Sequence, residues 1–153
     1  MIVFRLGKLQ YVRDLSGHGA EKSGGRWNSK GIPVLYTSQS RALCMAEVAV
    51  HLPLGILPID YQIATIELPE NASLFELPMS NLPATWKSFP HPHSTQQIGD
   101  RFIREGKNLI LKVPSVVVPG DYNYLINPRH SDFTHVRLVS VEPFGFDERL
   151  FVK

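Results

Sequence analysis

The sequence contains a single cysteine among its 153 residues, so no disulfide can form within the chain. Cys44 lies in an apolar stretch with no neighbour that would activate it, which favours a buried thiol in a reducing compartment. No signal-peptide pattern is visible, and no run reaches the roughly 18 apolar residues that span a bilayer. We therefore expect a cytoplasmic protein with no membrane association.

An excess of one charge is also missing. The chain has 16 basic and 14 acidic residues, and its lysines and arginines are scattered singly. Binding to nucleic acid usually depends on clustered cations that contact phosphates, so we expect no direct nucleic-acid binding. His91 and His93 are followed by no third ligand at metal-site spacing, and we expect no metal. The chain also lacks the Gly-x-Ser-x-Gly elbow of many serine hydrolases.

Proline and glycine are plentiful, with 12 and 11 residues, and they interrupt the chain throughout. This pattern favours short strands and structured loops over a helical bundle. The expected strands do not alternate regularly with helices, and this pattern argues against a doubly wound parallel sheet. The sequence predicts one α+β domain over residues 1–153, with short, mostly antiparallel strands and a few helices.

Hydrophobic periodicity locates the expected elements. A helix is predicted from a cap at Ser38 or Ser40 to about Leu52, and a more polar helix over Thr95 to Glu105. Long loops are expected at 14–31 and 69–92. Strands are predicted at residues 2–6, 33–37, 61–68, 109–113, 115–118, 124–126 and 136–141.

Arg26 follows two glycines, which let a guanidinium approach a bulky anion closely. Trp27 offers a stacking face and Asn28 a two-way hydrogen bonder, a combination suited to a planar ligand that carries phosphate. A loop arginine that holds its own chain is the alternative interpretation.

Tyr36 and Glu47 are two further candidates. Tyr36 in a strand could simply fill the core, but an aromatic ring also attracts the flat cation of oxidised nicotinamide. Glu47 interrupts an apolar helix face that it shares with Leu43 and Val50, where a charge needs a task or a partner. It could pair with a buried arginine, or stabilise positive charge that develops on a ribose.

Ser115 and Asn123 complete the candidates. Ser115 is either a polar residue at a strand start or a member of the site, and Asn123 could reach the site from its loop.

The chain resembles the RES domain family, which is named for its Arg, Glu and Ser. The resemblance rests on an ordered set of short motifs: Phe4-Arg5, Leu15-Ser16-Gly17-x-Gly19-Ala20, Gly24-Gly25-Arg26-Trp27-Asn28, Leu35-Tyr36-Thr37-Ser38, Ala46-Glu47, Pro114-Ser115 and Asn127-Pro128-x-His130. Ser131 stands where many family members place a proline. The set spans essentially the whole chain, and its combination is specific.

The resemblance implies a fold similar to ADP-ribosyltransferases and a bacterial toxin that consumes NAD, with an antitoxin partner carrying a helix-turn-helix (Xre-like) domain. NAD is then the substrate, and no prosthetic group is expected. The resemblance places Arg5 and Arg26 on the NAD phosphates, Tyr36 against the nicotinamide, Glu47 at the scissile ribose and Ser115 in the pocket.

We therefore expect a toxin that hydrolyses NAD at the nicotinamide–ribose bond. One alternative keeps this chemistry but transfers ADP-ribose to a protein. Another is a non-catalytic dinucleotide-binding or interaction module, in which Arg5 and Glu47 form a buried ion pair.

Overall fold

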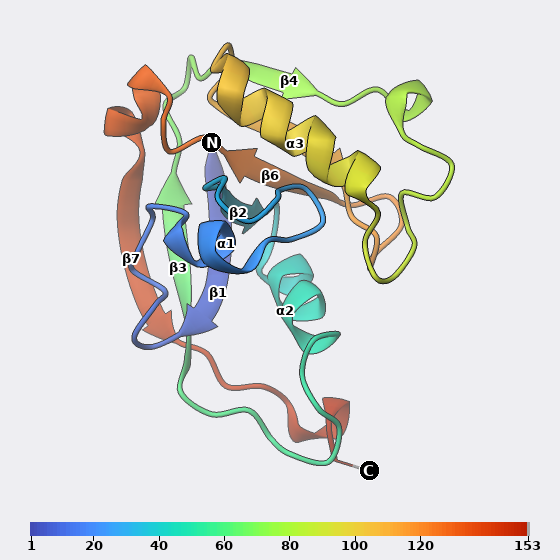
Figure 1. The fold of residues 1–153 in the computed structure, drawn as a ribbon. Helices are drawn as coiled ribbons and strands as arrows, with labels where there is room; N and C mark the ends of the chain where they lie inside the picture. Colours follow the sequence, from blue (N-terminus) through green and yellow to red (C-terminus); the bar gives the residue numbers. More distant parts are fainter. Residues whose placement is uncertain (153) are drawn as a thin grey trace.

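A computed structural model describes residues 1–152 of the chain. Over these residues seven strands form one sheet in the order β4-β5-β6-β2-β1-β3-β7 (Figure 1). The strands are β1 Ile2–Lys8, β2 Leu35–Ser38, β3 Tyr61–Glu67, β4 Leu74–Glu76, β5 Ile110–Pro114, β6 Tyr122–Ile126 and β7 Arg137–Pro143. The helices are α1 His18–Ser23, α2 Arg41–Ala49 and α3 His93–Glu105, with short 3-10 turns at Met79–Asn81, Ser131–His135 and Glu148–Leu150.

The sheet is weakly joined at its centre. Every neighbouring pair is antiparallel except β4 and β5. β1 pairs with β3 along its whole length, but it pairs with β2 only at Phe4 and Ser38. Since few ladder bonds close this junction, side chains from both halves of the sheet can reach the opening between β1 and β2.

Each face of the sheet carries its own hydrophobic cluster, as strand alternation requires. On one face, α3 packs Phe102 and Ile103 against Leu111 and Leu125. On the other, the buried side chains include Val3, Leu35, Ile66, Leu68, Leu109, Ile110 and Ile126. Gly99 allows the close approach of α3, because a Cβ there would lie 1.6 Å from the carbonyl oxygen of Trp27.

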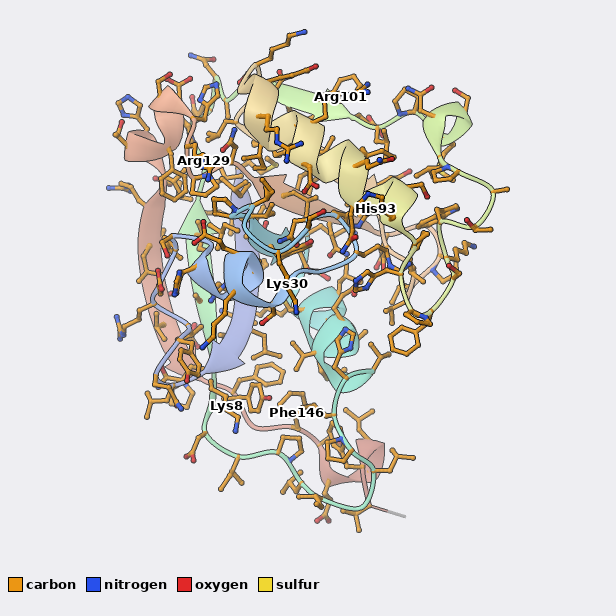
Figure 2. The ribbon with its side chains drawn as sticks, in the orientation of Figure 1. Lys8, Lys30, His93, Arg101, Arg129 and Phe146 are labelled. Atoms are coloured by element: carbon orange, nitrogen blue, oxygen red, sulfur yellow. The ribbon has the colours of Figure 1, made fainter. Side chains whose placement is uncertain are left out.

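The C-terminal segment is anchored by aromatic contacts. Phe146, labelled in Figure 2, makes edge-to-face contacts with Tyr61, Phe144 and Phe151, with ring centroids 5.1 to 5.4 Å apart. Phe151 in turn accepts a hydrogen bond from the amide of Gly55 on the loop between α2 and β3. No helix in residues 1–152 is both long enough and apolar enough to cross a membrane.

The predicted α+β class with mostly antiparallel strands is confirmed. Three local predictions were wrong. Residues 115–118 form a turn rather than a strand, the expected loop at 14–31 contains α1, and the expected loop at 69–92 contains β4. In addition, α2 ends at Ala49, whereas the sequence predicted a helix that continues to about Leu52.

Candidate active site

Glu47 lies on α2, which begins where the side chain of Ser40 accepts a hydrogen bond from the amide of Leu43 at 3.0 Å. Two donors converge on one oxygen of the Glu47 carboxylate. The Ser115 hydroxyl donates to Oε1 at 2.7 Å, and the Asn123 amide nitrogen donates to it at 2.6 Å. Within residues 1–152 no group donates to Oε2. One oxygen is therefore fixed by two donors, and the other has no donor among the described residues.

Ser115 is committed to its role as a donor. Its Oγ accepts hydrogen bonds from the amides of Val117 and Val118, at 3.1 and 3.0 Å, in the turn between β5 and β6. A hydroxyl has two lone pairs and one proton, so both lone pairs are occupied and the proton points to Glu47. Ser115 is also buried, with 3% of its surface exposed. This geometry suits a residue that orients Glu47, and it does not suit a nucleophile.

Glu47 lines a cavity of about 170 Å³ at the opening between β1 and β2. The lining residues are Phe4, Arg5, Leu6, Tyr36, Thr37, Ser38, Cys44, Glu47, Val48 and Asn123. Pockets that enclose drug-sized ligands measure roughly 300 to 1,000 Å³, so this one holds one end of a dinucleotide at most. Hollows of about 450 and 540 Å³ are lined by neither Glu47 nor Tyr36, and we assign the site by its chemistry rather than by size.

Arg5 lies on the opposite face of β1 from Phe4 and Leu6, as strand alternation dictates. Its guanidinium donates to the carbonyl oxygens of Val12 and Tyr11, at 3.3 and 3.2 Å. Burial lowers the pKa of Arg5, and this is opposed by the nearby Asp14 carboxylate. Among the described residues Arg5 and Glu47 form no ion pair. The buried Arg5–Glu47 ion pair that the non-catalytic alternative requires is therefore not present among these residues.

Arg26 connects two loops. One guanidinium nitrogen donates to the carbonyl oxygens of Trp86 and Ser88, at 2.7 and 2.9 Å. Burial lowers the pKa of Arg26, while the Glu47 charge acts in the opposite direction. The charges of Arg26 and Glu47 therefore interact, although the two side chains form no ion pair. Arg26 does not line the cavity.

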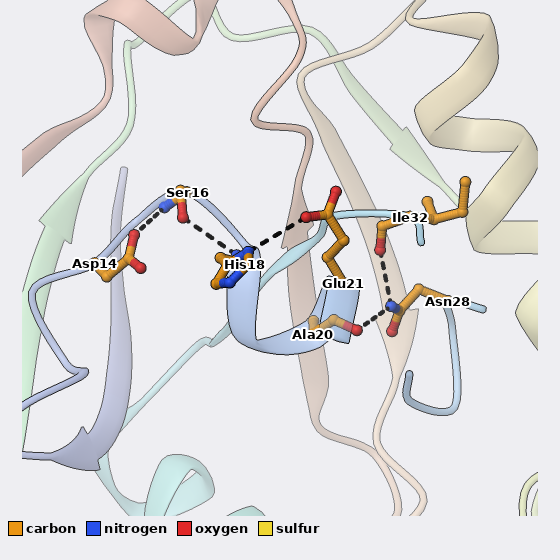
Figure 3. A network of polar contacts seen from close by, with 7 residues as sticks. All are labelled: Asp14, Ser16, His18, Ala20, Glu21, Asn28 and Ile32. Carbon is orange, nitrogen blue, oxygen red and sulfur yellow. Dashed lines mark hydrogen bonds and ion pairs between the residues drawn. The ribbon is translucent and has the colours of Figure 1, made fainter. Parts of the chain in front are cut away.

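Trp27 and Asn28 are buried, and the expectation that they contact a ligand does not fit this structure. Trp27 is 4% exposed and belongs to the core beside Trp86, with ring centroids 6.5 Å apart. Asn28 is fully buried, and its amide nitrogen donates to the carbonyl oxygens of Ala20 and Ile32 (Figure 3). Since its hydrogen-bonding groups are satisfied within the protein, Asn28 shapes the loop instead of reading a ligand.

Tyr36 both stabilises the fold and lines the cavity. Its hydroxyl donates to Oδ1 of Asn28 at 2.6 Å and accepts from the amide of Trp27 at 3.1 Å. Burial raises the pKa of this hydroxyl. The hydroxyl therefore holds the Gly-rich loop, while the residue also lines the cavity beside Glu47.

Ser38 and Cys44 are site residues that sequence reasoning did not select. The Ser38 hydroxyl donates to Oδ1 of Asn123 at 2.7 Å. Burial raises the pKa of the Cys44 thiol to about 11, so the thiol stays protonated at neutral pH. Cys44 lies three residues before Glu47, a helical spacing that places both on one side of α2 and was readable from the sequence. The contact between Ser38 and Asn123 depends on the pairing of two strands, so the sequence around either residue does not indicate it.

The two histidines considered as metal ligands do not line this cavity. His91 and His93 lie on the loop before α3 and at its first residue, and Figure 2 labels His93 there. Burial, Arg26 and His51 together lower the pKa of His91. Among residues 1–152 no group of three or more His, Cys, Asp or Glu side chains is arranged to hold a metal ion.

Comparison with known proteins identifies relatives of nearly the same length. A family model for the RES domain matches residues 2–147. The Prs ADP-ribosylating toxin of a Sphingobium species is 37% identical over 142 residues, covering 92% of this chain and 88% of that protein. Toxin Res of Yersinia enterocolitica is 37% identical over 153 residues, covering 98% of this chain and 99% of the relative. Toxin Res of Pseudomonas putida is also 37% identical, over 148 residues.

A solved structure shares the fold. A chain in the crystal structure of the M. tuberculosis MbcT–MbcA toxin–antitoxin complex superposes with a TM-score of 0.72. The match covers 94% of this chain and 84% of that chain, at 21% sequence identity.

Proposed function

This chain belongs to the RES domain family, and we propose that it is the toxin of a toxin–antitoxin pair that cleaves NAD at the nicotinamide–ribose bond. The observation that carries this proposal is the Glu47 carboxylate. One of its oxygens is held by Ser115 and Asn123, and the other has no donor within residues 1–152. The residues that line the cavity beside it include an aromatic one, Tyr36, and a basic one, Arg5.

Glu47 supplies the charge that the proposed reaction needs. Cleavage breaks the bond between the ribose C1′ and the nicotinamide nitrogen, and both bonding electrons leave with nicotinamide. Positive charge develops on the ribose, and an ionised carboxylate stabilises it. The departing nicotinamide is neutral and needs no proton, so one carboxylate suffices where most glycosidases use two. Water then bonds to C1′ and releases a proton, which gives ADP-ribose.

Tyr36 and the arginines supply binding in this proposal. The Tyr36 ring stacks against the cationic nicotinamide, a contact worth roughly 0.5 to 2 kcal/mol. Arg5 and Arg26 contact the phosphates. Because Arg26 contacts two loop carbonyls through one nitrogen, its other nitrogens remain for a phosphate oxygen.

Transfer of ADP-ribose to a protein is the second candidate function. It is favoured by the name of the Sphingobium relative, an ADP-ribosylating toxin. The Glu47 arrangement serves both reactions, because they differ only in the group that attacks C1′. Incubation of a cell extract with labelled NAD separates them. Label that appears as free ADP-ribose supports hydrolysis, and label that remains on protein supports transfer.

An antitoxin partner completes the proposal. It is supported by the relatives named Toxin Res and by the fold shared with the MbcT–MbcA complex. From the family resemblance we expect the antitoxin to carry a helix-turn-helix (Xre-like) domain and to act on the toxin in the cytoplasm. We propose that it occludes the site near residues 14–31, so the purified complex should lose NAD binding. Unchanged NAD binding by the complex would count against occlusion.

The direct test of the proposed activity uses the purified protein alone. Incubation with NAD should release nicotinamide over time, measured by chromatography. Induced expression should also lower intracellular NAD before growth stops. A protein that stops growth while NAD stays level does not act by the proposed reaction.

A further inference from the structure

Ser38 occupies the point where the two halves of the sheet meet. It is the last residue of β2, where it pairs with Phe4 of β1 on one side and with Asn123 of β6 on the other. Directly paired residues in adjacent strands point to the same face, so the side chains of Ser38 and Asn123 lie next to each other. Ser38 is 5% exposed, and its hydroxyl donates to Oδ1 of Asn123 at 2.7 Å.

The Asn123 amide has two ends with opposite hydrogen-bonding character. In the observed orientation its nitrogen lies 2.6 Å from Oε1 of Glu47 and its oxygen faces Ser38. A carboxylate accepts hydrogen bonds only, so the reversed amide would place two acceptor oxygens against each other. The Ser38 hydroxyl holds the oxygen end and so fixes which end of the amide meets Glu47.

From this chain of contacts we propose that Ser38 is a positioning residue for Glu47. The inference rests on the proposed function, since it assigns Ser38 a part in the same reaction. Ser38 fixes the Asn123 amide, and the amide together with the Ser115 hydroxyl holds one carboxylate oxygen of Glu47. The other oxygen is then presented to the ribose in a single orientation. Such preorganisation contributes to the transition state, so it should affect turnover more than substrate binding.

A double-mutant cycle on nicotinamide release tests this role. Ser38→Ala should lower kcat by about 2- to 10-fold, the worth of one hydrogen bond between neutral groups, with little change in KM. Asn123→Ala should lower kcat as much or more. If the effect of Ser38 passes through Asn123, as proposed, adding Ser38→Ala to Asn123→Ala should have no further effect on kcat. Ser40→Ala is the matched control, since it removes a nearby helix-capping serine that does not line the cavity and should lower Tm while kcat stays unchanged.

Two results would overturn the proposal. One is a loss of kcat from Ser38→Ala that is just as large in the Asn123→Ala background. The other is an unchanged kcat in a folded Ser38→Ala protein, which would make the Ser38 contact purely structural.

A second measurement does not depend on the reaction. The measurement compares NMR spectra of each variant with that of the parent protein. The side-chain amide signals of Asn123 should shift in Ser38→Ala and in Glu47→Gln, and should keep their parental positions in Ser40→Ala. If the parent releases no nicotinamide, the proposed function fails, and these signals still decide whether Ser38 holds the amide. Signals that Ser38→Ala leaves in place would refute the positioning role.

Discussion

The Ser115 hydroxyl donates to the Glu47 carboxylate across 68 residues of sequence, at 2.7 Å, while two backbone amides occupy its lone pairs. This single contact links the turn after β5 to α2. It also determines what the serine can do, because a hydroxyl whose lone pairs are taken cannot attack a substrate.

Ser115→Ala should therefore reduce both stability and activity. The variant leaves the amides of Val117 and Val118 without their acceptor and removes one donor from Glu47, so a loss of about 1 to 3 kcal/mol in unfolding free energy is expected. Nicotinamide release should fall as well when it is measured well below the Tm. A folded variant with parental activity would return Ser115 to a purely structural role.

Arg26→Ala should weaken NAD binding by about 1.5 to 3 kcal/mol, because a charge-assisted contact to phosphate is lost. The structure adds a second expectation. Loss of the contacts to Trp86 and Ser88 should increase hydrogen exchange in the loop before α3. Arg137→Ala is the control, since Arg137 pairs with Glu67 on the exposed surface and does not line the cavity. Normal NAD affinity in Arg26→Ala, with faster exchange alone, would make Arg26 a loop clamp.

Tyr36→Phe should separate the two roles of this residue. The ring remains, so NAD affinity should be nearly unchanged. The buried bonds to Asn28 and Trp27 are lost, and the free energy of unfolding should fall by about 1 to 3 kcal/mol. Tyr36→Leu should instead weaken NAD binding, as calorimetry can measure. Equal NAD affinity in the parent and the leucine variant would exclude stacking on this ring.

Gly99→Ala should be strongly destabilising, because the added methyl group would meet the Trp27 carbonyl oxygen at 1.6 Å and force α3 away from the loop. Overpacking of this kind typically costs about 1 to 3 kcal/mol, and a backbone neighbour places the change at the upper end. Gly19→Ala in α1 is a matched control with no atom within 4 Å of the new methyl group. Thermal melting of both variants checks the difference, and an unchanged Tm for Gly99→Ala would contradict the packing described.

The sequence predicted those parts of the fold that depend on local patterning. The apolar periodicity of α2 and the alternation of β3 and β7 are local signals, and all three elements are present. Residues 115–118 show a similar strand-like pattern of β-branched residues, but they form a turn. The Ser115 hydroxyl accepts hydrogen bonds from two backbone amides of this segment and so stabilises the turn. β4 was missed because it is only three residues long and is stabilised by pairing with β5.

The site was predictable only in part, for a similar reason. The family resemblance selected Glu47, Tyr36, Arg5, Ser115 and Arg26, and the local sequence added Asn123. Tyr36, Arg5 and Asn123 line the cavity beside Glu47 and Ser115 bonds to it, whereas Arg26 does not line the cavity. Trp27 and Asn28 belong to the same motif as Arg26, yet they face the core. Which residues of a loop motif point outward is set by what packs over the loop. Here that is α3, whose packing over the loop is not encoded in the loop's own sequence.

Glu47→Gln tests the central claim most directly. The change keeps the size of the side chain and removes the charge that the reaction needs, so melting temperature and NAD affinity should stay near those of the parent. Nicotinamide release should fall by roughly 10²- to 10³-fold, the usual worth of a preorganised electrostatic contact of about 3 to 4 kcal/mol. Expression of the variant should no longer arrest growth. A stable Glu47→Gln protein that binds NAD and releases nicotinamide at the parental rate would contradict the account.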